Sequence, residues 1–590
     1  MNLNGNKLCI HPTPPHQRRM DVCRLSVDSN TDTLIMALIY LSNICLLLLL
    51  FTFRFLDDNT LLSWAWVFDK ATLLKTILVL LPATFVVNLL IKNIEKYRYL
   101  PVLLFILSFL AVVPLWSIPE MYIDSARYSN QANALARHGL IYFLQQWGDA
   151  IPAWTDQPMG ALFFGTATSL FPDSRITQQV LTSSMFSGTI VVVFLTGQLL
   201  QNRLIGLYAS LLLLGIPFLL VQTPLMMVDV TTVFLLSLAI FLILKYIATD
   251  SLNWGAAAAA GICAAVMSKY SAALVFLCLF VSLFAVHLHD WRRLTRQLGL
   301  MLLASTLLAS PYLIGKFHLV LGQLQILTQY QLPGLMRWQE SHVSTFAFQV
   351  HPFLTIAGIA ALVIAWRRRE SLFLCLAGTM VLFLLTGVQR SRYLLILFPI
   401  LSLLGAYALS TMRDRRLATI IISLTLTSSL AITYVAYKPF LQSTSSHNIL
   451  AAGNYLDELP EAAAKVIVLP QTGSIVNPQI ILPLLDIQTR KRLVIDEQLQ
   501  FSTHVPQDAV KTSPVRFSWS FDPLPGYRGE LDDTIGAVVV IASNLNQLRE
   551  FSAMHQHNNY YLAKEFHQQE GVFKFTTLVS IYRPVVASSG

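Results

Sequence analysis

Long apolar stretches separated by short polar turns make up most of this chain of 590 residues. A stretch of roughly 17–25 predominantly apolar residues is long enough to cross a bilayer as an α-helix. Thirteen candidate spans can be read from the sequence: 34–53, 73–92, 100–117, 178–200, 204–221, 228–247, 254–268, 271–287, 297–315, 350–366, 371–388, 392–412 and 417–437. The pattern predicts a polytopic α-helical membrane protein. The least distinct boundary lies inside 254–287, which we expect to divide near Lys269.

Composition agrees with a membrane protein and argues against a nucleic-acid-binding one. Hydrophobic residues make up 55% of the chain and charged residues only 12%, whereas soluble domains carry about 25% charged residues. The net charge of +9 comes from short basic clusters between apolar runs, which is the pattern that orients membrane proteins. The six cysteines form no CxxC or Cys/His pairing, so neither a disulfide framework nor a zinc site is indicated.

The basic clusters predict the orientation of the chain. With a cytoplasmic N-terminal tail (1–33) and the first span retained as an anchor, alternate loops fall inside, and those loops hold the basic residues that positive-inside sorting requires. They are Lys96, Arg98, Arg203, Arg292, Arg293, Arg296, Arg367, Arg368, Arg369, Arg413, Arg415 and Arg416. The odd number of spans then places the C-terminus outside the cytoplasm.

Three segments are expected on the outer side: 118–175, 316–349 and the tail 438–590. The tail alternates strand-like runs (465–469, 492–495 and 537–541) with helix-like segments (449–459 and 545–555). Roughly 150 residues suffice for one domain, and alternation of strand and helix favours an α/β unit. We therefore predict a transmembrane domain (34–437) followed by a C-terminal extracytoplasmic α/β domain (438–590).

Acidic residues lie near the outer ends of several spans. The segment 125–137 is helix-like, with Gly139 just past its end. Asp124, Arg127, Tyr128 and Gln131 share one face of this helix, where a carboxylate beside an Arg could accept a proton from a hydroxyl. Helix capping is the commoner use of such an Asp.

Two further acids have similar alternatives. Asp156 precedes Pro158 at a predicted helix start and could cap that helix. Asp229 lies at the outer end of a span, where it either faces a polar cavity or is simply hydrated.

The basic residues on the same side are Lys269, Arg390 and Arg392. Lys and Arg are the natural ligands of phosphate oxygens. Snorkelling of each side chain to water is the alternative for each one taken singly. Together, the acids and cations predict a site at the outer membrane boundary.

These motifs, in this order, resemble those of bacterial GT-C glycosyltransferases, which include protein O-mannosyltransferase-like enzymes and lipid A aminoarabinose transferases. The resemblance covers roughly 118–404. It is carried by the segments around Asp124 to Gly139, 156–158, 224–229, 267–269 and 392–399. Departures from the family pattern are Ser125 for a second acid, Gln157 for Lys, Met159 for Pro and Tyr270 for Gly. Two additional spans also precede the acidic loop.

The resemblance implies roles for the site residues. Asp124 corresponds to the catalytic base, Asp156 and Asp229 to second acids, and Lys269 and Arg392 to donor-phosphate contacts. Arg127 is added as a phosphate contact because its helix places it beside Asp124, and Tyr128 and Pro158 are supporting residues.

The implied reaction is inverting transfer of a sugar from a polyprenyl-phosphate carrier to a lipid, glycan or protein acceptor. It would occur at the outer face of a bacterial cytoplasmic membrane, with membrane lipid but no nucleic acid as a partner. A divalent metal ion is left open as a cofactor. Two alternatives remain at this point. A transporter or flippase for a lipid-linked or anionic substrate would also need intramembrane charges, and a non-catalytic assembly factor would use the tail to bind a partner.

Overall fold

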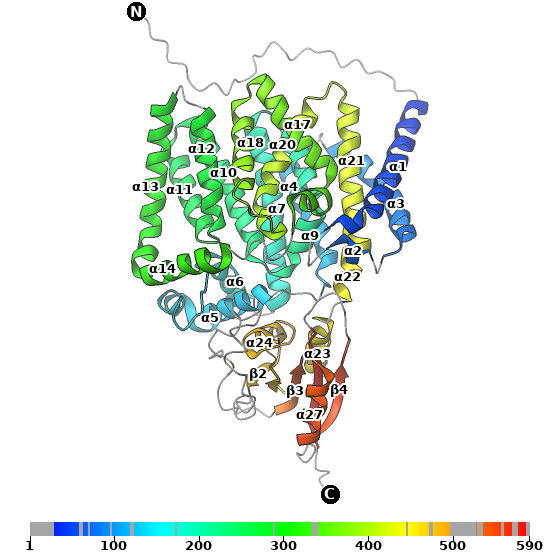
Figure 1. Ribbon diagram of the computed structural model, residues 1–590, viewed down its shortest axis with the longest axis vertical. Helices are drawn as coiled ribbons and strands as arrows, with labels where there is room; N and C mark the ends of the chain where they lie inside the picture. The colour runs from blue at the N-terminus through cyan, green and yellow to red at the C-terminus, as the bar shows by residue number, and fades with distance from the viewer. Residues whose placement is uncertain are drawn as a thin grey trace, which may run out of the picture.

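The computed structural model describes residues 29–57, 63–68, 71–94, 97–118, 123–171, 174–286, 290–332, 340–443, 446–470, 476–495, 527, 535–555, 560–568 and 576–585. A bundle of long helices forms one end of the molecule, and a smaller domain with a β-sheet forms the other (Figure 1).

Every one of the thirteen predicted stretches is helical. The bundle helices are α1 (Ser29–Thr52), α3 (Leu73–Ile94), α4 (Leu100–Val112), α7 (Ser174–Leu200), α8 (Arg203–Leu214), α9 (Pro217–Gln222), α10 (Val228–Thr249), α11 (Leu252–Val266), α12 (Ser271–Val286), α13 (Trp291–Gly315), α17 (Pro352–Arg368), α18 (Ser371–Leu384), α19 (Ser391–Leu394), α20 (Phe398–Ser410) and α21 (Arg415–Ile432). Among the described residues, five helices are long and apolar enough to span a membrane, two bent pairs add two more candidates, and six apolar helices are shorter. The number of actual crossings stays a prediction.

The centre of the bundle is formed by α7, α8, α10 and α20, which pack against one another. Small residues let two of these helices approach closely. A Cβ atom added to Gly197 of α7 would lie 2.6 Å from the Cα of Gly206 in α8, so any larger residue at this position would push the two helices apart.

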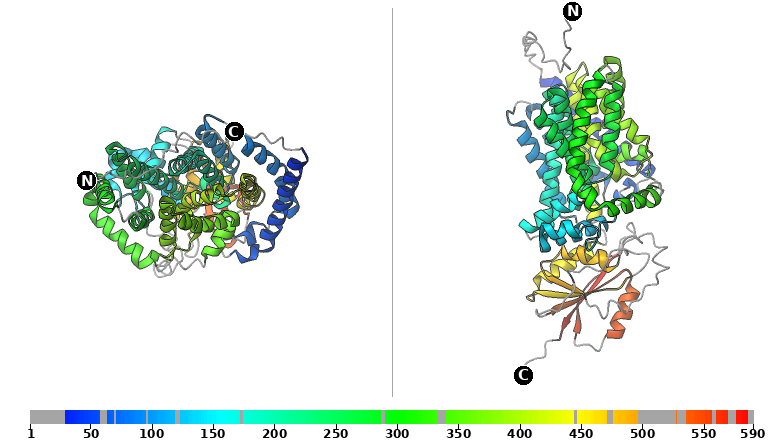
Figure 2. Two further views of the ribbon diagram at one scale, coloured as in Figure 1. Left: turned by 90° about the horizontal axis from the view of Figure 1, so that it is seen from above. Right: turned by 90° about the vertical axis from the view of Figure 1, so that its left-hand side faces the viewer.

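Three helices run across the boundary between the bundle and the C-terminal domain. They are α5 (Ile123–Gln146), α6 (Pro158–Leu170) and α14 (Phe317–Ile326) (Figures 1 and 2). Gly139 has φ +81° and interrupts α5, as its predicted position beyond a helix end requires. The sequence predicted 316–349 only as an outer segment, because α14, with 10 residues, is too short to resemble a span.

The C-terminal domain is a five-stranded sheet in the order β2-β1-β3-β5-β4. Its strands are β1 (Ala463–Val468), β2 (Arg492–Ile495), β3 (Ile535–Ala542), β4 (Tyr560–Phe566) and β5 (Leu578–Pro584). β1 pairs in parallel with β2 and β3, and β5 is antiparallel to β3 and β4. The first three correspond to the predicted strands. β4 and β5 were missed, because neither is a continuous apolar run.

Helices cover both faces of the sheet. One face packs in a buried apolar cluster with α23 (Ser446–Glu458) and α24 (Pro478–Asp486), and the other packs with α27 (Leu545–His555). A short helix, α22 (Lys438–Gln442), continues the last bundle helix. The boundary between the two domains, predicted at 438, stays a prediction.

Candidate active site

Arg127 connects two of the three acids. Its guanidinium group is bidentate to Asp156: Nη2 lies 2.8 Å from one carboxylate oxygen, and Nε contacts the other. Its Nη1 atom lies 3.1 Å from Oδ1 of Asp124, one turn earlier in α5. Gln131, one turn later, donates to Asp156 over 3.0 Å. The helical face predicted from the spacing therefore points at Asp156.

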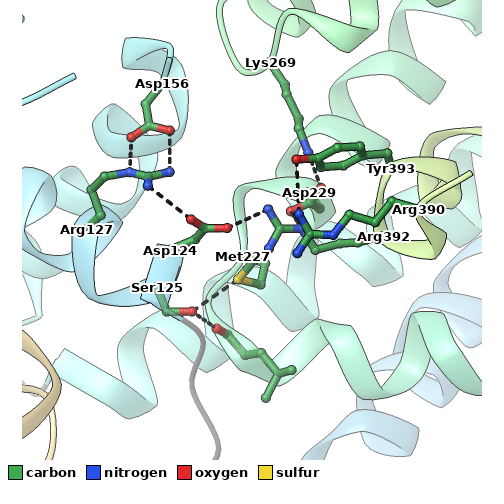
Figure 3. A network of polar contacts seen from close by, with 11 residues as sticks. Asp124, Ser125, Arg127, Asp156, Met227, Asp229, Lys269, Arg390, Arg392 and Tyr393 are labelled. Atoms are coloured by element: carbon green, nitrogen blue, oxygen red, sulfur yellow. Dashed lines mark hydrogen bonds and ion pairs between the residues drawn. The ribbon is translucent and has the colours of Figure 1, made fainter. Parts of the chain in front are cut away.

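Arg392 connects Asp124 to the third acid. Its Nη2 atom lies 2.6 Å from Oδ2 of Asp124, and its Nε atom lies 3.4 Å from Oδ2 of Asp229. Lys269 pairs with the other oxygen of Asp229. Charges therefore alternate through the site in the order Asp156, Arg127, Asp124, Arg392, Asp229, Lys269 (Figure 3). We call this set the charge chain.

An aromatic ring lies among the cations. The Tyr393 ring centroid is 4.6 Å from Lys269 Nζ, 5.2 Å from Arg390 Cζ and 5.7 Å from Arg392 Cζ. A ring face attracts cations, so Tyr393 helps to hold three positive groups close together. The sequence motif had marked Tyr393 only as a neighbour of Arg392.

The backbone before α10 places Asp229. Met226 has φ +56°, a left-handed conformation that turns the chain into the helix. Asp229 lies in the first turn of α10, where the helix dipole favours a negative charge. Ser125 donates a 2.6 Å hydrogen bond to the carbonyl oxygen of Leu225 and so ties α5 to this turn. Ser125 stands where the family pattern has a second acid, and in this chain it makes a structural contact instead.

Lys269 lies in the short connection between α11 and α12, where the sequence was expected to divide. The preceding Ser268 donates to Oγ1 of Thr232 in α10 over 3.0 Å. The amide of Met159 donates to the Met267 carbonyl oxygen over 3.0 Å. These contacts fix the turn against both α10 and α6.

Two departures from the family pattern meet at one residue. The buried Gln323 of α14 accepts hydrogen bonds at the same oxygen from Gln157 (3.0 Å) and from the Tyr270 hydroxyl (2.6 Å). Its amide group donates to the carbonyl oxygens of Ala153 (3.2 Å) and Asp156 (3.0 Å). Gln323 therefore holds the loop that carries Asp156. The sequence missed it because a single Gln in a mixed-composition segment has no pattern.

The capping alternative for Asp156 is not what the structure has. Gln157 occupies the N-cap position of α6, without a side-chain cap hydrogen bond, and Pro158 is the first residue of that helix. The carboxylate of Asp156 is instead bound by Arg127 and Gln131. Likewise, Lys269 and Arg392 do not simply reach for water, because each pairs with an acid.

A fourth acid, Glu340, supports Arg392 indirectly. One of its carboxylate oxygens accepts from both the backbone amide and the hydroxyl of Ser391, the first residue of α19. Glu340 is buried. Nothing in the sequence pointed to it, because it lies between spans rather than beside a motif.

The residues of the charge chain differ in the exposure of their side chains and in the pKa of their carboxyl groups. Asp124 and Lys269 are each 19% exposed, whereas Asp229 is 1% exposed. Burial would raise the pKa of the Asp124 carboxyl, but Arg392, Arg127 and Arg390 together hold it well below its ordinary value. Burial raises the pKa of Asp156, and its pairing with Arg127 opposes that rise. Burial also keeps the pKa of Tyr128 well above its ordinary value, so this hydroxyl stays protonated.

A divalent metal ion would compete with Arg side chains for the carboxylates of these acids. Within the described part of the chain, no three His, Cys, Asp or Glu residues are grouped so that they could hold a metal ion. Arg127 and Arg392 each already contact two carboxylates. A metal bound to Asp124 would therefore have to displace a guanidinium group. Asp124, Asp156 and Asp229 suit a metal in ligand type, but not in their present pairing.

Residues 155–314 match the protein family described as dolichyl-phosphate-mannose-protein mannosyltransferase. This segment includes Asp156, Asp229 and Lys269.

Solved structures with a similar fold include ArnT from Cupriavidus metallidurans bound to undecaprenyl phosphate. That chain is 13% identical, with a TM-score of 0.50, and the match covers 82% of this chain and 98% of that one. The apo state of the same protein matches at 12% identity and a TM-score of 0.48, over 81% and 97% of the two chains. An oligosaccharyltransferase from Archaeoglobus fulgidus in complex with Zn and sulfate matches at 13% identity and a TM-score of 0.44, over 74% and 67%. A comparison with curated protein sequences finds no match.

Proposed function

We propose that this chain, which resembles the GT-C membrane glycosyltransferases in its fold and in residues 155–314, transfers a sugar from a polyprenyl-phosphate carrier to an extracytoplasmic acceptor. The observation that carries the proposal is the charge chain. It brings a partly exposed carboxylate within ion-pair distance of guanidinium groups that could bind a phosphate.

The carrier phosphate would bind at Lys269 and Arg392. Both cations are at present paired with Asp229, and Arg392 also with Asp124. A phosphate can replace a carboxylate as a partner of Arg in the same bidentate manner. Arg127, on the far side of Asp124, is a further candidate contact.

Asp124 would act as the general base. Asp124 is ionised at neutral pH, and it would become a stronger base, able to accept the proton of an acceptor hydroxyl, when Arg392 leaves it for the phosphate. The acceptor oxygen would form a bond to the anomeric carbon on the face opposite the phosphate. The bond between that carbon and the phosphate oxygen would break, with inversion. Lys269 and Arg392 would stabilise the phosphate that leaves, an electrostatic role that is strong in a site shielded from water.

The arrangement supports the predicted orientation. Helix α5, which carries Asp124 and Arg127, and the C-terminal domain lie at one end of the bundle, whereas the end of α17, whose last turn contains Arg367 and Arg368, lies at the other (Figure 1). Positive-inside sorting would put that basic turn in the cytoplasm. The site would then face the outer side of the cytoplasmic membrane, where the acceptor is a lipid, a glycan or a protein.

Substitution of the base tests the proposal directly. General-base help typically supplies about 10²–10⁴ in rate, so Asp124→Asn should lower sugar transfer by at least that range. The measurement is transfer of radiolabelled sugar from a polyprenyl-phosphate donor to envelope extracts by the purified protein. The control is Asp149→Asn, because Asp149 lies in the same predicted outer segment, is 67% exposed and pairs with Lys316.

Asp149→Asn should retain wild-type transfer, since exposed ion pairs contribute little. A folded Asp124→Asn protein that transfers sugar at the wild-type rate would remove Asp124 as the base. A wild-type protein that moves the carrier across vesicles without adding sugar to any acceptor would favour the transporter instead.

A further inference from the structure

A second polar cluster joins α5 to the C-terminal domain. Asp486, the last residue of α24, accepts hydrogen bonds at Oδ2 from Asn133 Nδ2 (2.9 Å) and from the Tyr527 hydroxyl (2.8 Å). Arg137 Nη2 lies 3.7 Å from the same oxygen, and its guanidinium carbon lies 5.3 Å from the Tyr527 ring centroid. One carboxylate of the C-terminal domain therefore binds two residues of the helix that carries Asp124.

The contact surface around this cluster is apolar and continuous. Ala126, Tyr128 and Ala132 of α5 belong to the same buried cluster as Ile480 and Ile481 of α24 and one face of the sheet. The helices α5 and α24 pack directly on each other. The first half of α5 is thus part of the core of the C-terminal domain, and not a loop that lies beside it.

Helix geometry places the two polar sets on different sides of α5. Asn133 is nine residues after Asp124, and at 3.6 residues per turn this separation corresponds to roughly half a turn around the helix. Arg127 and Gln131 bind Asp156 on the site side, whereas Asn133 and Arg137 bind Asp486 on the domain side. The helix is held from both sides.

We propose that the C-terminal domain is a working part of the active site, and that Asp486 is a positioning residue that fixes α5 and thereby Asp124. The inference rests on the proposed function for its catalytic readout. The main donor-phosphate contacts, Lys269 and Arg392, come from other elements, and only the further candidate Arg127 lies on α5. Loss of the Asp486 contacts should therefore affect transfer more than carrier binding. A misplacement of about 1 Å can cost roughly 10²-fold in rate.

The experiment compares three variants of the full-length protein. Asp486→Ala removes every contact of the carboxylate, whereas Asp486→Asn keeps an oxygen that can accept from Asn133 and Tyr527. Glu461→Gln is the matched control, because Glu461 makes a partly buried ion pair with Arg583 (3.0 Å) elsewhere in the same domain. The measurements are kcat for sugar transfer, Kd for undecaprenyl phosphate, and hydrogen exchange of the amides of 124–137.

We expect Asp486→Ala to lower kcat about 10- to 100-fold, with Kd within about twofold and faster exchange in 124–137. Asp486→Asn should recover most of the lost rate, and Glu461→Gln should match the wild type in all three. A wild-type kcat and wild-type exchange in Asp486→Ala would overturn the proposal. Equal losses of kcat and carrier affinity in Asp486→Ala and Glu461→Gln would also overturn it, because the domain would then only stabilise the fold.

The exchange measurement separates this inference from the proposed function. If the wild-type protein transfers no sugar, the proposed function fails, whereas faster exchange in Asp486→Ala alone would still establish that the domain holds α5. If the wild type transfers sugar and Asp486→Ala behaves like it, the positioning role fails and the proposed function stands.

Discussion

Each guanidinium group in the charge chain contacts two carboxylates, and Asp124 and Asp229 each contact two cations, so these inner members keep a charged partner when one neighbour is removed. A buried charge without a partner is strongly destabilising, and the alternation avoids this. The same alternation lets a phosphate enter: when Arg392 turns to the phosphate, Asp124 keeps Arg127 and Asp229 keeps Lys269. We therefore expect ion-pair exchange, and not insertion of a new charge, when the carrier binds.

The depressed pKa of Asp124 predicts a pH dependence of stability. Because its folded pKa lies below the unfolded value of about 3.9, ionised Asp124 stabilises the folded protein above that value, and the contribution is lost as pH falls through the folded pKa. Asp124→Asn should thus lower Tm by a constant amount from pH 8 to about pH 5. The gap should narrow only at more acidic pH. Thermal unfolding in detergent measures it, and a gap that closes between pH 7 and 5 would mean that Asp124 is not held by the two Arg residues.

At the scale of helices and strands, the lengths of the apolar runs predicted the helices of the bundle and the breaks between them. The break in 254–287 lies at Lys269, the one charged residue that interrupts this apolar run. The lengths of the apolar runs could not predict helix α14 or the 119° bend between 342–350 and α17, because neither feature depends on a long apolar run. The ion pairs that join α5, α10 and α19 could not be derived either. The shared face of Asp124 and Arg127 followed from helical spacing, but their partners on other helices depend on packing between elements.

Glu340 and His342, at the start of the segment that leads into α17, contact the start of α19 and the residues before it. His342 Nε2 lies 2.8 Å from the Val388 carbonyl oxygen, and Glu340 accepts from Ser391 beside Arg392. A negative charge at a helix N-terminus is stabilising. Glu340→Gln removes that charge but keeps an oxygen acceptor, so Arg392 should be less firmly placed.

We expect Glu340→Gln to raise the Kd for undecaprenyl phosphate about 10-fold, which corresponds to roughly 1.4 kcal/mol. Glu370→Gln is the control, because Glu370 also precedes a bundle helix but its side chain makes no cap hydrogen bond. The affinity can be measured by tryptophan fluorescence on titration with the carrier. Equal affinities in the two variants would contradict a role for Glu340 in placing Arg392.

At the scale of the whole molecule, the fold and the match over 155–314 confirm the resemblance to GT-C membrane glycosyltransferases that the motifs indicated. The sequence predicted that acids and cations distant along the chain meet in one site, and the structure brings α5, α10 and α19 together through such ion pairs. The continuity of α5 with the core of the C-terminal domain was not predictable. Its apolar contacts come from residues more than 300 positions apart, and only the tertiary fold brings them together.

The sidedness of the molecule can be tested without any assay of activity. Arg368 is the last residue of α17, Asp149 follows α5, and Asn546 lies in α27; all three are exposed, and α5 and α27 lie at the other end of the molecule from the end of α17 (Figure 1). With the natural cysteines removed, we expect a membrane-impermeant maleimide to label Asp149→Cys and Asn546→Cys in sealed spheroplasts. Arg368→Cys should be labelled only after lysis, because positive-inside sorting keeps its turn in the cytoplasm. If only Arg368→Cys were labelled before lysis, the orientation would be the opposite of the predicted one, and the charge chain would lie on the cytoplasmic side. Labelling of all three would mean that the bundle does not separate its two ends by a membrane.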